Sequence, residues 1–127
     1  MDISGAFDTI SKKAIIEGLN RKSIPKFIIN WYEYYLTNRR AEAKIHDSKI
    51  TRFLRMGIPQ GSVLSSSAWN MGIDDIVENA NIGPSQVVAF ADDLFVMITR
   101  IDPDTLVDLA QPTIDKIKTL CENVSVK

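Results

Sequence analysis

Two adjacent carboxylates, Asp92 and Asp93, lie between two apolar runs of the sequence, and their type and position could support chemistry. The runs, 87–91 and 94–98, have the β-branched and aromatic content of buried strands. Two residues between such strands predict a tight hairpin with both aspartates at its tip. Two negative charges at that point need a cation or solvent nearby. The pair is therefore either a solvated turn or part of a divalent-metal site that takes a third carboxylate from elsewhere.

Composition limits the classes of protein that need to be considered. The 127 residues fit one domain, and the sequence has no internal repeat or linker, so a single domain is expected. No apolar run approaches the roughly 20 residues of a membrane span, and the acidic start does not resemble a signal peptide, so we expect an intracellular protein without a membrane partner. One cysteine, Cys121, excludes an internal disulfide and predicts no disulfide-linked partner. Cys121 is expected in the core and His46 in a strand.

Charge is unevenly distributed along the chain, although the net charge is only −1. Through Met56 there are eleven basic and six acidic residues, and from Gly57 onward four basic and ten acidic. A basic first half could hold phosphates beside an acidic second half that holds metal. Two ordinary solvated faces would produce the same pattern.

Helices are predicted over most of the remaining chain. Ser11 is expected to cap a helix that runs to about residue 22, and Pro25 to begin a second that runs to about residue 37. Apolar spacing predicts that the second helix turns one stripe inward: Phe27, Ile28, Trp31, Tyr35 and Leu36. A third helix is expected over 63–80 with Ser62 as its cap. A fourth is expected over 102–122 with Asp102 as its cap and a kink or break at Pro112.

A second hairpin and a glycine-containing loop separate these helices. Residues 41–46 and 50–54 are expected to form half-buried strands joined by a turn at 47–49. Six basic residues accompany this hairpin, and they either follow a phosphate backbone or form a solvated face: Arg39, Arg40, Lys44, Lys49, Arg52 and Arg55. The loop Gly57–Ser62 contains two glycines and a proline, which fix an unusual backbone path before the third helix.

Three stretches, taken in order, resemble motifs A, B and C of reverse transcriptases from non-LTR retrotransposons of the LINE or jockey type. They are Asp2–Asp8, the segment Gly57–Ser65 with Trp69 and Asn70 after it, and Phe90–Asp93. The resemblance implies an α+β fold: a polymerase palm with a ferredoxin-like (RRM-like) antiparallel sheet and packed helices, plus part of the fingers. It also implies that residues 1–127 are a fragment, since the upstream fingers and downstream thumb would lie outside it. We also expect a truncated N-terminus, because Asp2 leaves no room for a strand before it.

The same resemblance implies a template-dependent nucleotidyl transfer from a dNTP to a primer 3′ end by a two-metal mechanism. Asp2, Asp92 and Asp93 would be the catalytic carboxylates and would hold two Mg²⁺ ions, or Mn²⁺, with the backbone carbonyl of Ile3 facing a metal. Phe7 would reject the ribose 2′-hydroxyl. Gln60 and Gly61 would lie against the incoming nucleotide and the template. The partners implied are an RNA template, a DNA primer and a dNTP, and a nuclear location is expected from the family alone.

Two alternatives remain open at this stage. A palm-type nucleotide cyclase would show a Gly-Gly-Asp/Glu-Glu-Phe-like hairpin, which Phe90–Asp93 matches poorly. A decayed or repurposed element fragment would keep the aspartates and act only as a folded binding module. The isolated fragment is expected to be inactive as a polymerase.

Overall fold

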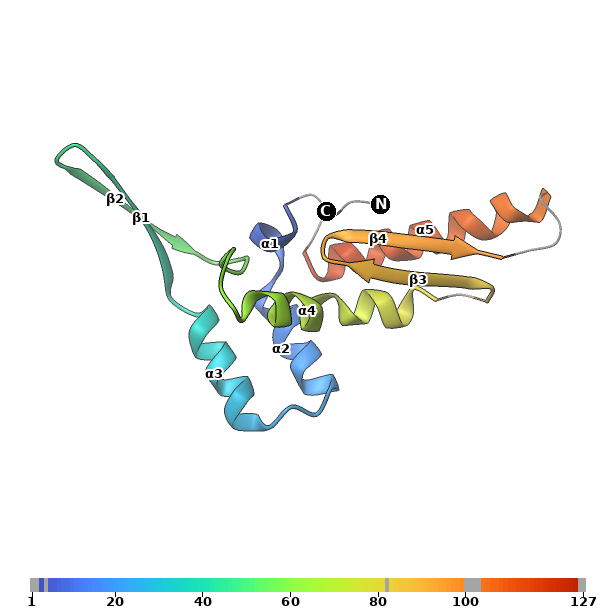
Figure 1. The fold of residues 1–127 in the computed structure, drawn as a ribbon, viewed down its shortest axis with the longest axis horizontal. Coiled ribbons are helices and arrows are strands. Elements are labelled where there is room, and N and C mark those ends of the chain that lie inside the picture. Colours follow the sequence, from blue (N-terminus) through green and yellow to red (C-terminus); the bar gives the residue numbers. More distant parts are fainter. Residues whose placement is uncertain (1–2, 4, 82, 100–103, 126–127) are drawn as a thin grey trace.

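The computed structural model describes residues 3, 5–81, 83–99 and 104–125, and they form an α+β arrangement of helices with two antiparallel hairpins (Figure 1). The elements in chain order are α1 (Ala6–Thr9), α2 (Lys12–Arg21), α3 (Lys26–Leu36), β1 (Arg39–Ile45), β2 (Ser48–Leu54), α4 (Ser65–Asn79), β3 (Ser85–Phe90), β4 (Asp93–Ile98) and α5 (Asp104–Asn123). The predicted fold class is confirmed. Within the described residues, no helix is both long enough and apolar enough to cross a membrane.

Helices α2 and α4 cross closely at the centre of the core. The closest approach is at Gly18, where a Cβ atom would lie 1.8 Å from the carbonyl oxygen of Met71. Ion pairs reinforce the crossing at its edge, with Lys22 Nζ 3.0 Å from Asp74 and 2.5 Å from Glu78. Hydrogen bonds to Glu78 and Asp74 raise the pKa of the Lys22 ammonium above its ordinary value. The α2–α4 crossing is thus the central contact between helices in the core.

The β3–β4 hairpin packs one face on the helices. Val87 and Leu94 are buried on that face, and α4 and α5 lie along the hairpin (Figure 1). The opposite face exposes alternate apolar side chains, as a one-sided sheet does: Val88, Phe90, Phe95 and Met97. The register pairs Phe90 with Asp93, so the turn residues are Ala91 and Asp92. The prediction that Asp93 lies in the turn was wrong by one residue, because Ala91 adopts the left-handed conformation, with φ 53°, that a two-residue turn needs.

The β1–β2 hairpin projects away from the helices (Figure 1). Its strands pair from Arg39 with Leu54 to Ile45 with Ser48. The predicted hairpin is confirmed, but the half-buried environment predicted for its strands was wrong, because every residue of both strands except Arg39 is exposed. His46 lies in the turn with φ 54° and not in a strand.

Several helix predictions are confirmed and others need correction. Ser11 caps α2, since its hydroxyl accepts a hydrogen bond from the Ala14 N–H at 3.1 Å. Helix α3 buries Ile29, Tyr32 and Leu36. Of the predicted stripe, Leu36 is buried and Ile28 and Tyr35 are partly buried against the core, whereas Phe27 and Trp31 are exposed.

The other two helices differ from their predictions at the start and at the proline. Helix α4 begins at Ser65, two residues later than expected, and Ser62 is not its cap. Helix α5 is continuous through Pro112, so the predicted break is absent, and the predicted cap Asp102 lies outside the described residues. Cys121 is buried in the core as predicted, and this burial raises the pKa of its thiol.

Candidate active site

The beginning of the described chain is hydrogen-bonded to the tip of the β3–β4 hairpin. The backbone N–H of Ile3 donates a hydrogen bond to the carbonyl oxygen of Asp92, at 3.0 Å. Ile3 is buried, whereas Asp92 and Asp93 are both exposed. The side chain of Asp2 lies outside the described residues, so its predicted approach to Asp92 is not placed. The hydrogen bond nevertheless brings the first and third motif segments side by side.

The loop that follows Met56 is hydrogen-bonded to the first motif segment. The N–H of Gly57 donates to the carbonyl of Ile10 at 2.8 Å, and the N–H of Ile58 donates to the carbonyl of Phe7 at 2.7 Å. Gly57 has φ 76°, and a Cβ atom there would meet two backbone oxygens at 2.7 Å. Only glycine combines a favourable positive φ with the absence of a Cβ atom, so this position fixes how closely the loop approaches α1.

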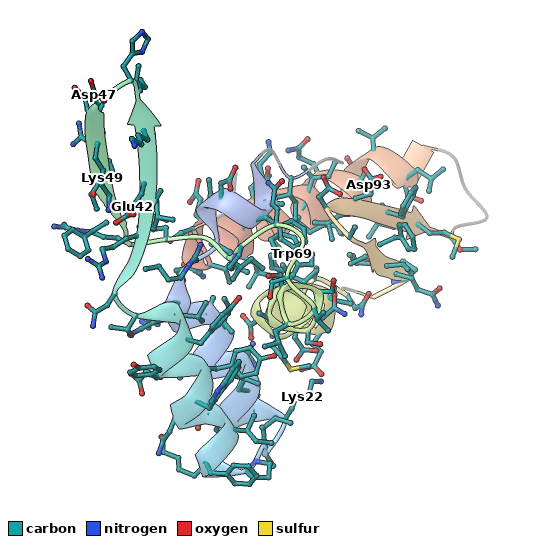
Figure 2. The ribbon with its side chains drawn as sticks, turned by 60° about the vertical axis from the view of Figure 1, so that its left-hand side comes forward. Lys22, Glu42, Asp47, Lys49, Trp69 and Asp93 are labelled. Atoms are coloured by element: carbon teal, nitrogen blue, oxygen red, sulfur yellow. The ribbon has the colours of Figure 1, made fainter. Side chains whose placement is uncertain are left out.

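Phe7 is held in place by Trp69 of α4. Their rings are stacked, with centroids 5.4 Å apart and planes 17° from parallel. The indole N–H of Trp69 donates to the carbonyl of Ala91 at 2.7 Å. Figure 2 shows Trp69 where α4 approaches the β3–β4 hairpin. One buried side chain therefore sets the position of both Phe7 and the hairpin turn.

A pocket of about 590 Å³ opens where these three segments meet. Four of the residues selected from the sequence line it, namely Phe7, Gln60, Gly61 and Asp92. The remaining lining residues come from the loop and the start of α4: Ser62, Val63, Ser65 and Ser66. Asp93 does not line the pocket; it is the exposed first residue of β4.

A sequence model of the family described as "Reverse transcriptase (RNA-dependent DNA polymerase)" matches residues 1–127. The chain belongs to the reverse transcriptase family. The predicted family is thereby confirmed, and the retrotransposon type is supported by two relatives. Both are named "Retrovirus-related Pol polyprotein from type-1 retrotransposable element R2". The one from Popillia japonica is 28% identical over 109 residues, and the one from Nasonia vitripennis is 28% identical over 107 residues.

The reverse transcriptase chain is much shorter than these relatives. Each alignment covers 76% of this chain, but only 15% of the Popillia japonica protein and 10% of the Nasonia vitripennis protein. The comparison therefore concerns one segment of a long polyprotein.

The acidic pair, Asp92 and Asp93, offers oxygen ligands of the kind that a hard cation takes. Neither Asp92 nor Asp93 forms an ion pair within the described part of the chain. Carboxylate oxygens are the ligands that magnesium and manganese prefer. Within 3, 5–81, 83–99 and 104–125, no group of three or more His, Cys, Asp or Glu side chains gathers as a metal site. The pair fits a metal site whose third predicted ligand, Asp2, lies outside those ranges.

Two residues of the candidate site were not selected from the sequence as functional. Trp69 is buried, and its hydrogen bond to Ala91 was not foreseen. Ser65 is buried and its hydroxyl donates to the carbonyl of Pro59, which holds the loop against α4. An indole or hydroxyl at a buried position needs a polar partner, and that need is the signal that could have identified them.

Proposed function

We propose that this chain forms the nucleotide-binding and metal-binding part of an RNA-directed DNA polymerase. The observation that supports the proposal best is the pocket shared by Phe7, Gln60, Gly61 and Asp92, which come from three separate segments of the sequence. Family membership supports the reaction class. The substrates we propose are a dNTP, a DNA primer and an RNA template.

Asp92 and Asp93, together with Asp2, are the residues proposed to hold two divalent ions, Mg²⁺ or Mn²⁺. When bound, such ions activate a primer 3′-hydroxyl and neutralise a leaving pyrophosphate. The protein contributes the carboxylates at a fixed turn, since Ala91 is hydrogen-bonded to Trp69 and Asp92 to Ile3. Positioning of this kind supplies much of the catalysis of phosphoryl transfer. The predicted contact of the Ile3 carbonyl with a metal is part of the same proposal.

Phe7 is proposed to select deoxynucleotides by steric exclusion. Its ring lines the pocket and cannot easily swing away, because the Trp69 indole stacks against it. Gly61 lies on the pocket wall with φ 80° and has open space where a Cβ atom would stand. A nucleotide can therefore approach the loop backbone closely at Gly61, with Gln60 beside it.

The metal assignment is tested by Mn²⁺ titration followed by NMR. Paramagnetic broadening should be strongest for the amides of Ile3, Ala91 and Asp93, and Asp92→Asn should abolish it while thermal unfolding stays nearly unchanged. The matched control is Asp47→Asn. Asp47 also follows a left-handed residue in a two-residue turn, and Figure 2 shows it at the far end of the other hairpin from Asp93.

Because the isolated segment is expected to be inactive, the reaction is tested in a longer polyprotein that contains it, by Mg²⁺-dependent extension of a DNA primer on an RNA template. Asp92→Asn should lower extension by more than about a hundredfold, as loss of a metal ligand does. Phe7→Val should leave extension with dNTPs unchanged, and it should increase the incorporation of ribonucleotides. Broadening that survives Asp92→Asn, or ribonucleotide discrimination unchanged by Phe7→Val, would contradict the corresponding assignment.

A further inference from the structure

A groove of about 450 Å³ lies where α3 meets β1, apart from the pocket described above. We call it the aromatic–arginine groove. Its lining consists of three aromatic residues of α3, two linking residues and two arginines of β1: Trp31, Tyr34, Tyr35, Thr37, Asn38, Arg39 and Arg40. The aromatic rings and the cationic groups therefore share one surface.

Two aromatic rings of the groove, those of Trp31 and Tyr34, are exposed, and the Trp31 ring is held by its neighbours. Trp31 is stacked on Tyr35, with ring centroids 5.3 Å apart and planes 10° from parallel. Its ring is nearly perpendicular to that of Tyr32, with centroids 5.2 Å apart. Trp31 still has 45% of its surface exposed, and Tyr34 has 83%. Core packing uses the other face of α3, through Ile29 and Leu36, and of the groove rings only Tyr35 lies partly against the core. Exposed, preorganised rings are suited to stacking with another flat ring.

The charges at the groove favour an anionic partner. Within the described ranges, neither Arg39 nor Arg40 forms an ion pair with a carboxylate. Glu33, the acidic residue of α3, lies 3.8 Å from Lys12 and is compensated by it. The hairpin that leaves the groove adds further exposed basic residues, among them Lys44 and Arg52. A negatively charged chain would thus meet the exposed Arg40 at the groove and further basic residues beyond it, with Lys44 and Arg52 on opposite faces of the hairpin.

The groove is connected to the loop that lines the pocket. The hydroxyl of Tyr35 donates to the Ser62 hydroxyl at 3.0 Å, and Ser62 is a lining residue of the pocket. Arg39 Nη1 donates to the carbonyl of Gly57 at 2.6 Å, at the other end of the same loop. A strand lying in the groove would therefore be held next to the backbone that faces the nucleotide.

We propose that the aromatic–arginine groove binds a single-stranded stretch of RNA, with bases stacked on Trp31 and Tyr34 and phosphates held by Arg39 and Arg40. Stacking requires unpaired bases, which distinguishes a single strand from a duplex. The identification of that strand as the template depends on the proposed function, but the binding itself needs neither the metal nor the aspartates.

Trp31 provides a direct readout of this binding. The chain has two tryptophans, and the other, Trp69, is buried. An oligouridylate of about 12 nucleotides, added with EDTA and without nucleotide, should quench the fluorescence of the protein. Trp31→Phe should remove the quenching, because only the buried indole remains. A fully paired duplex of the same length should quench much less.

Matched variants separate stacking and charge from general effects. Tyr34→Ala should weaken binding of the oligouridylate about tenfold, whereas Phe27→Ala should leave it unchanged. Phe27 is a suitable control because it is an aromatic residue of the same helix, is 73% exposed and does not line the groove. Arg40→Gln should reduce the slope of log affinity against log salt by about 0.7, more than the same change at Lys44.

The outcomes distinguish this inference from the proposed function. Asp92→Asn should bind the oligouridylate like the unmodified protein, since the groove acts without the metal site. Quenching that persists in Trp31→Phe, or equal losses in Tyr34→Ala and Phe27→Ala, would overturn the groove assignment. If RNA does not bind and Tyr34→Ala instead changes the mass measured by light scattering, the groove is a protein interface and the proposal is wrong.

Discussion

The indole of Trp69 contacts both sides of the candidate active site. It stacks on Phe7 from α1, and its N–H satisfies the carbonyl of Ala91 at the hairpin turn. These contacts join the first and third motif segments through a residue of α4. The position of Asp92 therefore depends on a side chain that touches neither substrate nor metal, and Trp69 is a positioning residue.

Trp69→Phe tests this role. The phenyl ring keeps part of the stacking but leaves the Ala91 carbonyl without its donor, so the free energy of unfolding should fall by about 1–3 kcal/mol. Urea unfolding measures the change, and the amide signals of Ala91 and Asp92 should shift. Trp31→Phe is the control, because the half-exposed indole of Trp31 should cost less than about 1 kcal/mol. Equal losses in the two variants would show that Trp69 is only one packing residue among others.

At the residue scale, local interactions could be predicted from the sequence and distant ones could not. The Ser11 cap is confirmed because its hydroxyl acts within one helical turn, three residues along the chain. The two turn residues were misplaced by one position, because Ala91 rather than an aspartate adopts positive φ. The Ala91 carbonyl also accepts the hydrogen bond of Trp69, a contact between distant segments that no local pattern encodes.

The crossing of α2 and α4 is the closest contact between elements. At Gly18 the two helices approach so nearly that a methyl group would overlap the Met71 carbonyl. This carbonyl belongs to the backbone of the partner helix and cannot rotate away. Separation of the helices would disturb the ion pairs of Lys22 and the neighbouring core.

Gly18→Ala is expected to destabilise the protein by more than about 2 kcal/mol through overpacking. This effect should outweigh the gain of about 1 kcal/mol that alanine brings to a helix over glycine. Chemical denaturation followed by circular dichroism measures the difference. Asn30→Ala on the exposed side of α3 should change stability by less than about 0.5 kcal/mol. A stabilised Gly18→Ala protein would mean that the two helices are further apart than described.

The burial of α3 shows why periodicity placed only part of the buried face of this helix. The helix carries two apolar stripes, and the sequence favoured the aromatic one, with Phe27 and Trp31. The structure buries Ile29 and Tyr32 against its neighbours. Periodicity finds an amphipathic helix but does not decide between two apolar faces, since that choice depends on which elements are adjacent. The exposed stripe contributes Trp31 to the aromatic–arginine groove.

Over the whole molecule, two hairpins of similar build experience different surroundings. Both have six or seven residues per strand and a two-residue turn with a left-handed first residue. The β3–β4 hairpin rests on α4 and α5, whereas β1–β2 projects away and is anchored at its base by Arg39 (Figure 1). An isolated two-stranded hairpin is marginally stable in water. The sequence predicted both hairpins, but it did not predict that β1–β2 lacks a covered face.

Amide hydrogen exchange should distinguish the two hairpins in the free protein. Amides of β1 and β2 are expected to exchange at least about a hundredfold faster than those of the buried face of β3–β4, because β1–β2 can open without disrupting the core. The β3–β4 hairpin is an internal control, since strand length and turn type are nearly matched and only burial differs. Oligouridylate should slow exchange at the base of β1 more than at the distal turn, since the groove ends at Arg40. Equal protection of both hairpins in the free protein would mean that β1–β2 is held by a surface, and the view of it as a free arm beside the groove would be abandoned.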